Sequence, residues 1–402
     1  MTTTSLAHAP GQPDPSFGPL FDGKLVHDLV FSGRTITEGP DGKFYIGGSS
    51  MESENGQIEY YFHLARFFND GKTDLEFGTD GSANIKLPKT EFFKASPIQL
   101  FFLADQGEDK ILVSVGANTV GVGAMAEALF LIQITGRGEL DKSFGDNGIV
   151  RLKSPFEADT SQPSITAPLH SGNTSTNRNA YVADGKIYLI SVGRDPDLGL
   201  PVGVVSRFNT DGTEDKTFGE NGHAALSKVL KVRSGLKDIV VQDGKITVCG
   251  FTDSAAMLAR LNIDGSFDKS FAGVGYTLLE GHDFQFLSLA VQTDGRIVAA
   301  GFGFPIPRRG LLAAYTSSGL IDRTFNQGAP IYETFDSSAS VLFLSLASRD
   351  GKTIVSGRHI IGETLKIVTA RYDGNGRRDT AFGNGRGWVL DEFNSDGVYF
   401  AD

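Results

Sequence analysis

A four-residue motif, Asp-x-x-Phe, recurs at long and similar intervals along the chain. Its seven copies are Asp14 and Phe17, Asp74 and Phe77, Asp141 and Phe144, Asp215 and Phe218, Asp268 and Phe271, Asp322 and Phe325, and Asp379 and Phe382. Successive aspartates are 60, 67, 74, 53, 54 and 57 residues apart. Because self-similarity at a period of tens of residues is the signature of a repeat architecture, the motif predicts a chain built from copies of one unit.

Each interval between two motifs carries the signals of short β-strands. An Asp-Gly or similar turn is followed by an apolar run that ends in glycine, as in "DGKITVCG" from Asp243 and "DGRIVAAG" from Asp294. An alternating run such as "LARLNIDG" then leads into the next motif. Short runs rich in Val, Ile and Phe that are bounded by Gly-containing turns predict strands rather than helices.

Each unit is therefore expected to hold four strands. Strand A precedes the Asp-Gly turn, strand B follows it, strand C leads into the motif, and strand D follows the motif phenylalanine. Repeats of about 55 to 60 residues in four antiparallel strands have the size of a propeller blade. We expect an all-β fold, a single β-propeller of four-stranded antiparallel blades in one domain, residues 1–402, with a flexible segment at residues 1–12 and a long inserted loop at 153–180.

The number of blades follows from counting strands. Strands A, B and C occur six times, whereas D-like segments occur seven times, one of them before the first strand A. A closed ring of six four-stranded blades needs six D strands. We therefore expect six blades, with one blade completed by strands from both chain ends. Seven blades, the last built from the spare D segments and the tail, are the alternative.

The motif lies within a longer pattern, N-x-D-G-x-x-D-x-S/T-F-G-x-x-G, as in "NTDGTEDKTFGENG" from Asn209. This pattern resembles the delta-sixty repeat, a bacterial β-propeller-like tandem repeat, from Asp14 to Gly387. Ala272 and Asn326 depart from it where other copies have glycine. The resemblance implies no catalytic residue and suggests an exported or cell-surface context. The N-terminal residues show no secretion signal, which leaves a cytoplasmic location open.

The repeated residues are interpreted as structural. Asp-Gly allows a positive φ at the glycine, the aspartate can accept backbone N–H groups two residues on, and the phenylalanine is expected to anchor neighbouring blades. An arginine stands eight residues before the motif aspartate in four units: Arg66, Arg207, Arg260 and Arg371. This spacing predicts a bidentate ion pair, with channel-lining arginines as the alternative. A Ca²⁺ loop is a further alternative for the aspartates, but the adjacent lysines disfavour it.

Composition excludes several classes of partner. The formal net charge is −11, so a nucleic-acid partner is not expected. Cys249 is the single cysteine, so neither a disulfide within the chain nor a site of several thiolates is expected. Membrane insertion is not expected, because the sequence lacks an apolar stretch of about 18 residues. No cofactor is expected, with Ca²⁺ as the alternative.

We expect the functional residues in the loops where the repeat varies, because binding residues usually lie on loops that a rigid scaffold holds in place. The B–C loops are predicted at residues 50–57, 117–127, 194–201, 302–310 and 358–364. They hold the candidate binding residues Glu52, Glu54, Arg194, Asp195, Asp197, Arg308, Arg309, Arg358, His359 and Glu363. We expect a non-enzymatic module that binds a protein or a glycan through its B–C and D–A loops. The alternative is a lactonase- or glycosidase-like propeller hydrolase with a carboxylate or Ca²⁺ site at the channel mouth.

Overall fold

The computed structural model describes residues 10, 17, 32–54, 57–87, 92–105, 108–121, 124–152, 180–281, 284–303 and 306–391. These residues form six four-stranded antiparallel sheets, which confirms the all-β fold. The first sheet contains β1 (Ser32–Glu38), β2 (Phe44–Glu54), β3 (Gln57–Phe67) and β4 (Ser82–Lys86). The second sheet contains β5 (Phe92–Asp105), β6 (Glu108–Gly121), β7 (Ala124–Thr135) and β8 (Ile149–Arg151). The third sheet contains β9 (Ala180–Ala183), β10 (Lys186–Arg194), β11 (Pro201–Asn209) and β12 (His223–Ala225).

The other three sheets follow in chain order. The fourth contains β13 (Ser234–Gln242), β14 (Lys245–Thr252), β15 (Ala255–Asn262) and β16 (Tyr276–Glu280), the fifth β17 (Gln285–Val291), β18 (Ile297–Gly303), β19 (Arg309–Tyr315) and β20 (Ile331–Glu333), and the sixth β21 (Ser340–Arg349), β22 (Lys352–Ile361), β23 (Thr364–Tyr372) and β24 (Trp388–Asp391). Two short helices, α1 (Ser227–Leu230) and η1 (Asn326–Gly328), lie between strands.

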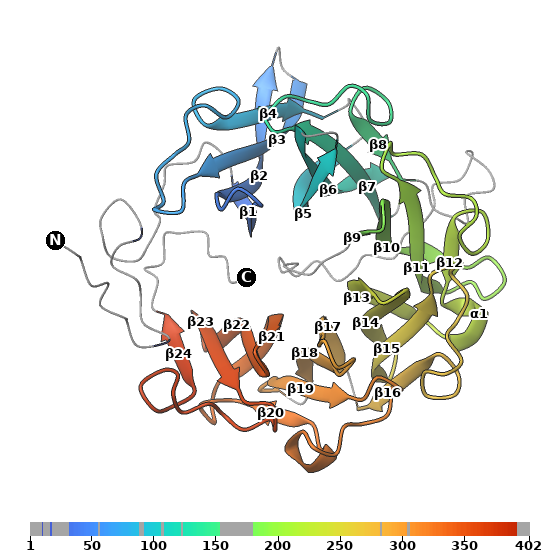
Figure 1. Ribbon diagram of the computed structural model, residues 1–402, viewed down its shortest axis with the longest axis vertical. Coiled ribbons are helices and arrows are strands. Elements are labelled where there is room, and N and C mark those ends of the chain that lie inside the picture. Colours follow the sequence, from blue (N-terminus) through green and yellow to red (C-terminus); the bar gives the residue numbers. More distant parts are fainter. Residues whose placement is uncertain are drawn as a thin grey trace.

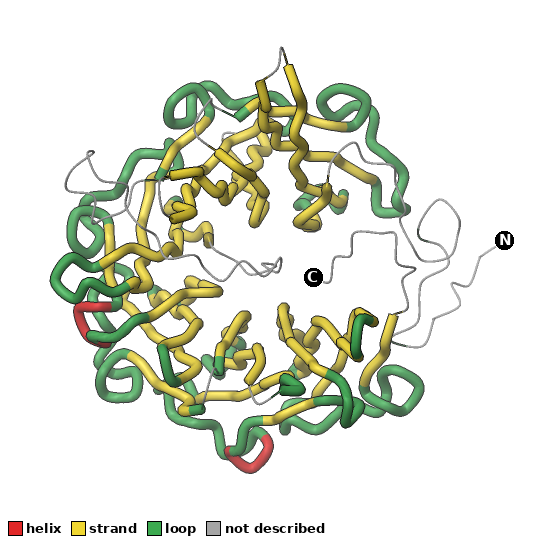
Figure 2. The backbone as a smooth tube through the Cα atoms, turned by 180° about the vertical axis from the view of Figure 1, so that it is seen from behind, coloured by secondary structure: helices red, strands yellow, loops and turns green. Residues whose placement is uncertain are grey.

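The sheets are arranged around a common centre. Hydrogen-bonded neighbours in each sheet are consecutive in the chain, so the four strands correspond to the predicted strands A, B, C and D. Figure 1 shows β1, β5, β13, β17 and β21 nearest the centre, and Figure 2 shows the same arrangement from behind. The inner strand of a sheet packs on the preceding sheet, as β5 does on β1 and β17 on β13. This is the arrangement of a β-propeller.

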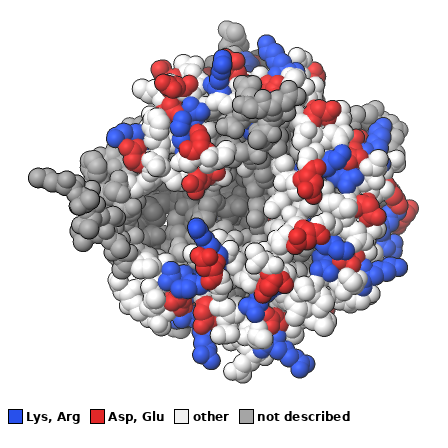
Figure 3. Space-filling view, viewed as in Figure 1, with Lys and Arg blue, Asp and Glu red and all other residues white. Residues whose placement is uncertain are grey.

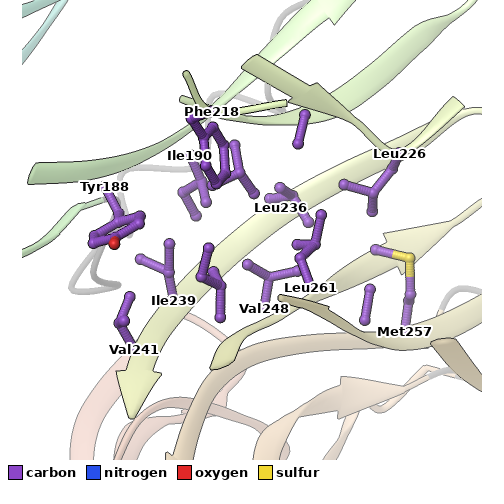
Figure 4. Close-up of a cluster of buried hydrophobic side chains, with 14 of the residues drawn as sticks. Tyr188, Ile190, Phe218, Leu226, Leu236, Ile239, Val241, Val248, Met257 and Leu261 are labelled. Carbon is purple, nitrogen blue, oxygen red and sulfur yellow. The ribbon is translucent and has the colours of Figure 1, made fainter. Parts of the chain in front are cut away.

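The hydrophobic core lies between successive sheets. Figure 4 shows the layer between the third and fourth sheets, where Tyr188 and Ile190 of β10 lie near Ile239 of β13 and Val248 of β14. The motif residue Phe218 belongs to the same layer and is fully buried. The motif phenylalanine is thus an anchor between two sheets, as the sequence predicts.

A glycine that recurs within strand B faces an irregularity in strand A. In the fourth sheet the pairing of β13 with β14 shifts after Leu236, which stands opposite Gly250. A Cβ atom at Gly250 would lie 1.9 Å from the carbonyl oxygen of Gly235. The same approach of 1.9 Å to a strand A carbonyl oxygen occurs at Gly301 and Gly357. The bulge therefore explains why glycine recurs at this position of strand B.

Three predicted B–C loops are strands over most of their length. Segments 50–57, 117–127 and 358–364 were expected to be loops, but β2 continues to Glu54, β6 to Gly121 and β22 to Ile361. An antiparallel ladder can close with a very short turn, so pairing extends through residues that lack a clear strand pattern. Of the predicted inserted loop, residues 153–179 lie outside the described residues, and so do residues 1–9, 11 and 12 of the N-terminal segment.

Candidate functional site

The corner between strands C and D is built around the motif aspartate. In the fourth sheet, Asp268 Oδ1 accepts hydrogen bonds from the backbone N–H and the Oγ of Ser270, at 3.0 and 2.6 Å. Asp268 Oδ2 accepts a hydrogen bond from Arg260 Nε at 2.8 Å and lies 3.1 Å from Lys245 Nζ. Burial alone would raise the pKa of Asp268, but the hydrogen bonds from Ser270 and Lys245 and the charge of Arg260 lower it to about 2. The aspartate therefore locks its own turn.

The same ion pairs recur in the other sheets. Arg66 Nε and Lys43 Nζ lie 2.7 and 2.8 Å from Asp74, Arg207 Nε and Lys186 Nζ both lie 2.9 Å from Asp215, and Arg371 Nε and Lys352 Nζ lie 2.8 and 2.7 Å from Asp379. Two sheets lack the strand C arginine, and there Lys110 lies 2.9 Å from Asp141 and Arg296 lies 2.8 Å from Asp322. The predicted Arg–Asp pair is present in all four units that carry the arginine.

The arginine is not bidentate towards the carboxylate, in contrast to the prediction. Arg207 Nε donates to Asp215 at 2.9 Å, whereas Nη1 donates to the carbonyl oxygen of Ile263 in the next unit at 2.5 Å. The guanidinium carbon also lies 4.9 Å from the ring centroid of Phe218. The N–H groups of the planar guanidinium point in different directions, so one of them meets the carboxylate of its own sheet and another meets the turn of the next sheet. Arg207 is buried in this position and does not line an open channel.

A backbone hydrogen bond joins each C–D corner to the next unit. The residue after the motif phenylalanine donates its N–H to the carbonyl oxygen four residues before the next motif aspartate. The pairs are Gly78 with Arg137 at 2.9 Å, Gly145 with Asp211 at 3.0 Å, Gly219 with Asp264 at 2.8 Å, Ala272 with Ser318 at 2.7 Å, and Asn326 with Asn375 at 2.8 Å. In the sixth sheet, Gly383 donates to Pro10 at 3.2 Å, and Pro10 precedes Asp14 by four residues.

The B–C hairpins and D–A loops lie at the other end of the strands from the C–D corners, and we call their surface the loop face. Five of the predicted binding residues are exposed on it: Glu52, Arg194, Asp197, Arg309 and Glu363. Glu54 ends β2, and its side chain is outside the described part of the structure.

Two predicted arginines of the loop face are half-buried. The guanidinium carbon of Arg308 lies 5.0 Å from the ring centroid of Phe302. Arg358 lies within β22, and burial lowers the pKa of its guanidinium group. Arg308 therefore places its charge against an aromatic ring, and Arg358 is partly withdrawn from solvent.

Two other predicted binding residues are buried, which corrects their placement on the surface. Asp195 accepts hydrogen bonds from the backbone N–H groups of Asp197 and Leu198, at 2.9 and 3.0 Å, so it locks the β10–β11 turn. His359 lies inside the sixth sheet, paired in register with Val341 on β21 and Lys366 on β23. Continuation of β22 past the predicted loop start is the reason that His359 is buried.

Exposed apolar side chains accompany the charges at three B–C hairpins. Leu200 is 36% exposed, Ile306 78%, Ile361 39% and Leu365 40%. Over the surface seen in Figure 3, acidic and basic side chains lie beside each other and do not separate into regions of one sign. The loop face thus combines exposed apolar groups with charges of both signs.

A polar cluster on the first sheet was missed by the sequence analysis. Ser50 Oγ lies 2.6 Å from His63 Nε2, and His63 Nδ1 lies 2.6 Å from Asn84 Oδ1. The three residues come from β2, β3 and β4. They are separated by 13 and 21 positions in the chain, a spacing that belongs to no known local motif. Only the register of the strands brings them together.

Within the residues described, no group of three or more His, Cys, Asp or Glu side chains is placed to hold a metal ion. That part of the chain also contains no helix with the length and apolar character needed to cross a membrane.

Comparison with known proteins gives one family match. The family described as "Domain of unknown function (DUF5122) beta-propeller" matches residues 39–77 and 242–271. Both segments run from an A–B turn to a motif phenylalanine. No curated protein matches the chain.

Among solved structures, the polysaccharide lyase Uly1 is 10% identical, with a TM-score of 0.45 over 97% of this chain and 88% of its own. The α-L-arabinofuranosidase Arb93A from Fusarium graminearum is 9% identical, with a TM-score of 0.44 over 91% and 97%. A quinoprotein alcohol dehydrogenase-like protein from Bacteroides thetaiotaomicron is 13% identical, with a TM-score of 0.42 over 92% and 70%. The chain spans 44% of a further structure named only as a glycoside hydrolase. The family match supports a β-propeller built from repeats.

Proposed function

We propose that this chain is a β-propeller binding module that engages a protein or a glycan through its loop face. The proposal is carried by the contrast between the two ends of the sheets. At the C–D corners the motif aspartates are paired with basic side chains of the chain itself, as Asp215 is with Arg207. On the loop face, Arg194, Arg309 and Glu363 are exposed. Exposed charges on loops of a rigid scaffold are available to a partner.

The loop face is continuous between the fifth and sixth sheets. The backbone N–H of Val341 at the start of β21 donates to the carbonyl oxygen of Arg308 at 2.8 Å, and the N–H of Arg308 donates to Ser340 Oγ at 3.1 Å. These contacts attach the β18–β19 hairpin, with Ile306 at its tip, to the sheet that carries Ile361. A partner could therefore contact both hairpins at once, with apolar groups in the centre and charges at the rim.

The proposal includes closure of the ring by both chain ends, in a repeat of the delta-sixty type. The carbonyl oxygen of Pro10 accepts the N–H of Gly383, as a carbonyl oxygen of the next unit does at each of the other five corners. The ring of Phe17 lies 6.0 Å from that of Phe44 on the first sheet. The two described residues before Ser32 therefore make separate contacts, Pro10 with the corner of the sixth sheet and Phe17 with the first sheet. These contacts support a ring that is closed by a seventh unit, whereas the count of strands favours a ring of six.

A paired comparison tests the binding proposal. The native protein, a loop-face variant (Ile306→Ser, Ile361→Ser and Leu365→Ser) and a corner variant (Leu75→Ser, Val274→Ser and Leu320→Ser) are applied to a glycan array and to a pull-down from the native cell. The corner variant is a matched control because Leu75, Val274 and Leu320 are 68%, 47% and 61% exposed. We expect the native protein and the corner variant to bind the same ligands and the loop-face variant to lose them. Equal retention by all three, or loss in the corner variant alone, would contradict the proposal.

A further inference from the structure

Ser50, His63 and Asn84 form a hydrogen-bonded chain across three strands. His63 of β3 stands directly opposite Asn84 of β4, and Ser50 of β2 is its diagonal neighbour, because His63 pairs with Gly48. Directly opposite and diagonal residues on one face of a sheet are close enough for side-chain contact. The strand register therefore places the hydroxyl, the imidazole and the amide in line.

The direction of the hydrogen bonds follows from the groups involved. Asn84 Oδ1 carries no proton, so His63 Nδ1 must donate to it at 2.6 Å. The Nε2 atom of the neutral ring then holds a lone pair and accepts the hydroxyl proton of Ser50 at 2.6 Å. Burial lowers the pKa of His63, although Asn84 and the charge of Glu52 act in the opposite direction. The imidazole is therefore neutral near pH 7 and able to take up a proton.

The cluster lies on the face of the first sheet that is turned away from the second sheet. Phe62 and Leu64 of β3 point to the second sheet, and His63 lies between them on the other side of the strand. His63 is 2% exposed, whereas Ser50 is only partly buried and Asn84 is exposed. The imidazole is thus held firmly, and the hydroxyl keeps access to the surface.

We propose that Ser50 is a nucleophile for acyl transfer, with His63 as its general base and Asn84 as the residue that positions the imidazole. A hydroxyl in hydrogen-bond contact with a base that is oriented by a third group is the arrangement of an activated nucleophile. The substrate class is an ester with an accessible carbonyl group. This activity goes beyond the binding proposed for the loop face, although Glu52 of that face acts on the pKa of His63.

The reaction needs only the ester and water. Ser50 Oγ attacks the carbonyl carbon while its proton passes to His63 Nε2, and the tetrahedral intermediate collapses as the C–O bond to the leaving alcohol breaks. The alcohol takes the proton from Nε2, leaving an acyl ester on Ser50. Water then attacks this ester, its proton passing to Nε2 and on to Ser50 Oγ, and the carboxylic acid is released.

The third sheet offers an internal control. Ser206 Oγ lies 2.8 Å from His223 Nδ1, again across neighbouring strands. Ser206 is buried, and among the described residues no third side chain holds the other ring nitrogen of His223. If a serine–histidine contact alone produced reactivity, Ser206 would react as Ser50 does.

A fluorophosphonate probe tests the proposal on the full chain. The Ser50 oxygen would form a bond to phosphorus with loss of fluoride, which intact mass and peptide mapping detect. We expect one adduct at Ser50 and none at Ser206, no adduct in Ser50→Ala, and unchanged labelling in Ser206→Ala. His63→Gln should slow labelling by about 100-fold or more.

A second pair of variants separates positioning of the base from general stability. Asn84→Asp keeps an acceptor for His63 Nδ1–H and should retain labelling, whereas Asn84→Ala should slow it by about 10-fold or more. Asn84 is exposed, so neither change should prevent folding. No adduct on the native protein, an adduct that persists in Ser50→Ala, equal labelling of Ser206, or equal rates in Asn84→Asp and Asn84→Ala would each overturn the proposal.

Discussion

The backbone N–H of Gly383 lies 3.2 Å from the carbonyl oxygen of Pro10, and this contact joins the sixth sheet to the N-terminal segment. Five other corners make the equivalent bond to the unit that follows them in the chain, as Gly219 does to Asp264. Pro10 thus makes to Gly383 the contact that Asp264 makes to Gly219.

Removing the contact between the N-terminal segment and the first sheet should weaken the fold. Phe17→Ala deletes the edge-to-face contact with Phe44 and should lower the free energy of unfolding by about 1–2 kcal/mol. Leu75→Ala, at a side chain that is 68% exposed, should change it by less than about 0.5 kcal/mol. Urea denaturation of both variants measures the difference, and equal stabilities would show that Phe17 does not contribute to closure.

Because units pack closely at the corners, replacing Gly265 by alanine should destabilise the fold more than replacing Gly185, although both glycines have a positive φ. Gly265 (φ +89°) and Gly185 (φ +67°) would both be strained by alanine, at about 1–2 kcal/mol each. A Cβ atom at Gly265 would also lie 2.8 Å from the backbone nitrogen of Gly219 in the preceding unit, whereas Gly185 has nothing within 4 Å. Gly265→Ala should therefore be less stable than Gly185→Ala by a further 1–3 kcal/mol, roughly. Thermal and urea unfolding check this, and a difference near zero would rule out close packing at the corner.

The ion-paired aspartates should make stability depend on acid pH. Because the pKa of Asp268 is lowered to about 2 from 3.8, its contribution is fully present above about pH 4 and is lost as the pH falls through about 2. The shift corresponds to about 2 kcal/mol. Asp268→Asn removes this contribution, so the stability difference between native protein and variant should shrink by about that amount between pH 6 and pH 2. Urea midpoints at both pH values measure it, and a constant difference would show that the carboxylate pairing is not stabilising.

The parts of the fold that the sequence predicts are those that the repeat shows several times. The roles of Phe218 and Asp268 are recognisable because each has equivalents in the other units. The constant spacing between Arg260 and Asp268 predicts the ion pair of these two residues. The strand B lysine was missed, although Lys245 and its equivalents follow the A–B turns in five of six units. Its pairing with the motif aspartate depends on the order of strands in the sheet.

The candidate sites were predicted less well because they occur once. Asp195 and His359 were expected on the surface, but a local turn buries the first and the extension of β22 buries the second. Ser50 and His63 meet through strand register, which loop and motif patterns in the sequence do not encode. Single-copy features of this kind require the coordinates of neighbouring strands.

The central claim is that the partner binds the loop face and leaves the C–D corners free. Hydrogen–deuterium exchange of the native protein, with and without a ligand identified by the array or pull-down, tests it most directly. We expect the ligand to slow exchange in the hairpins at residues 194–201, 306–309 and 361–365 and to leave the corners at 67–82 and 209–223 unchanged. Protection confined to the corners would contradict the account.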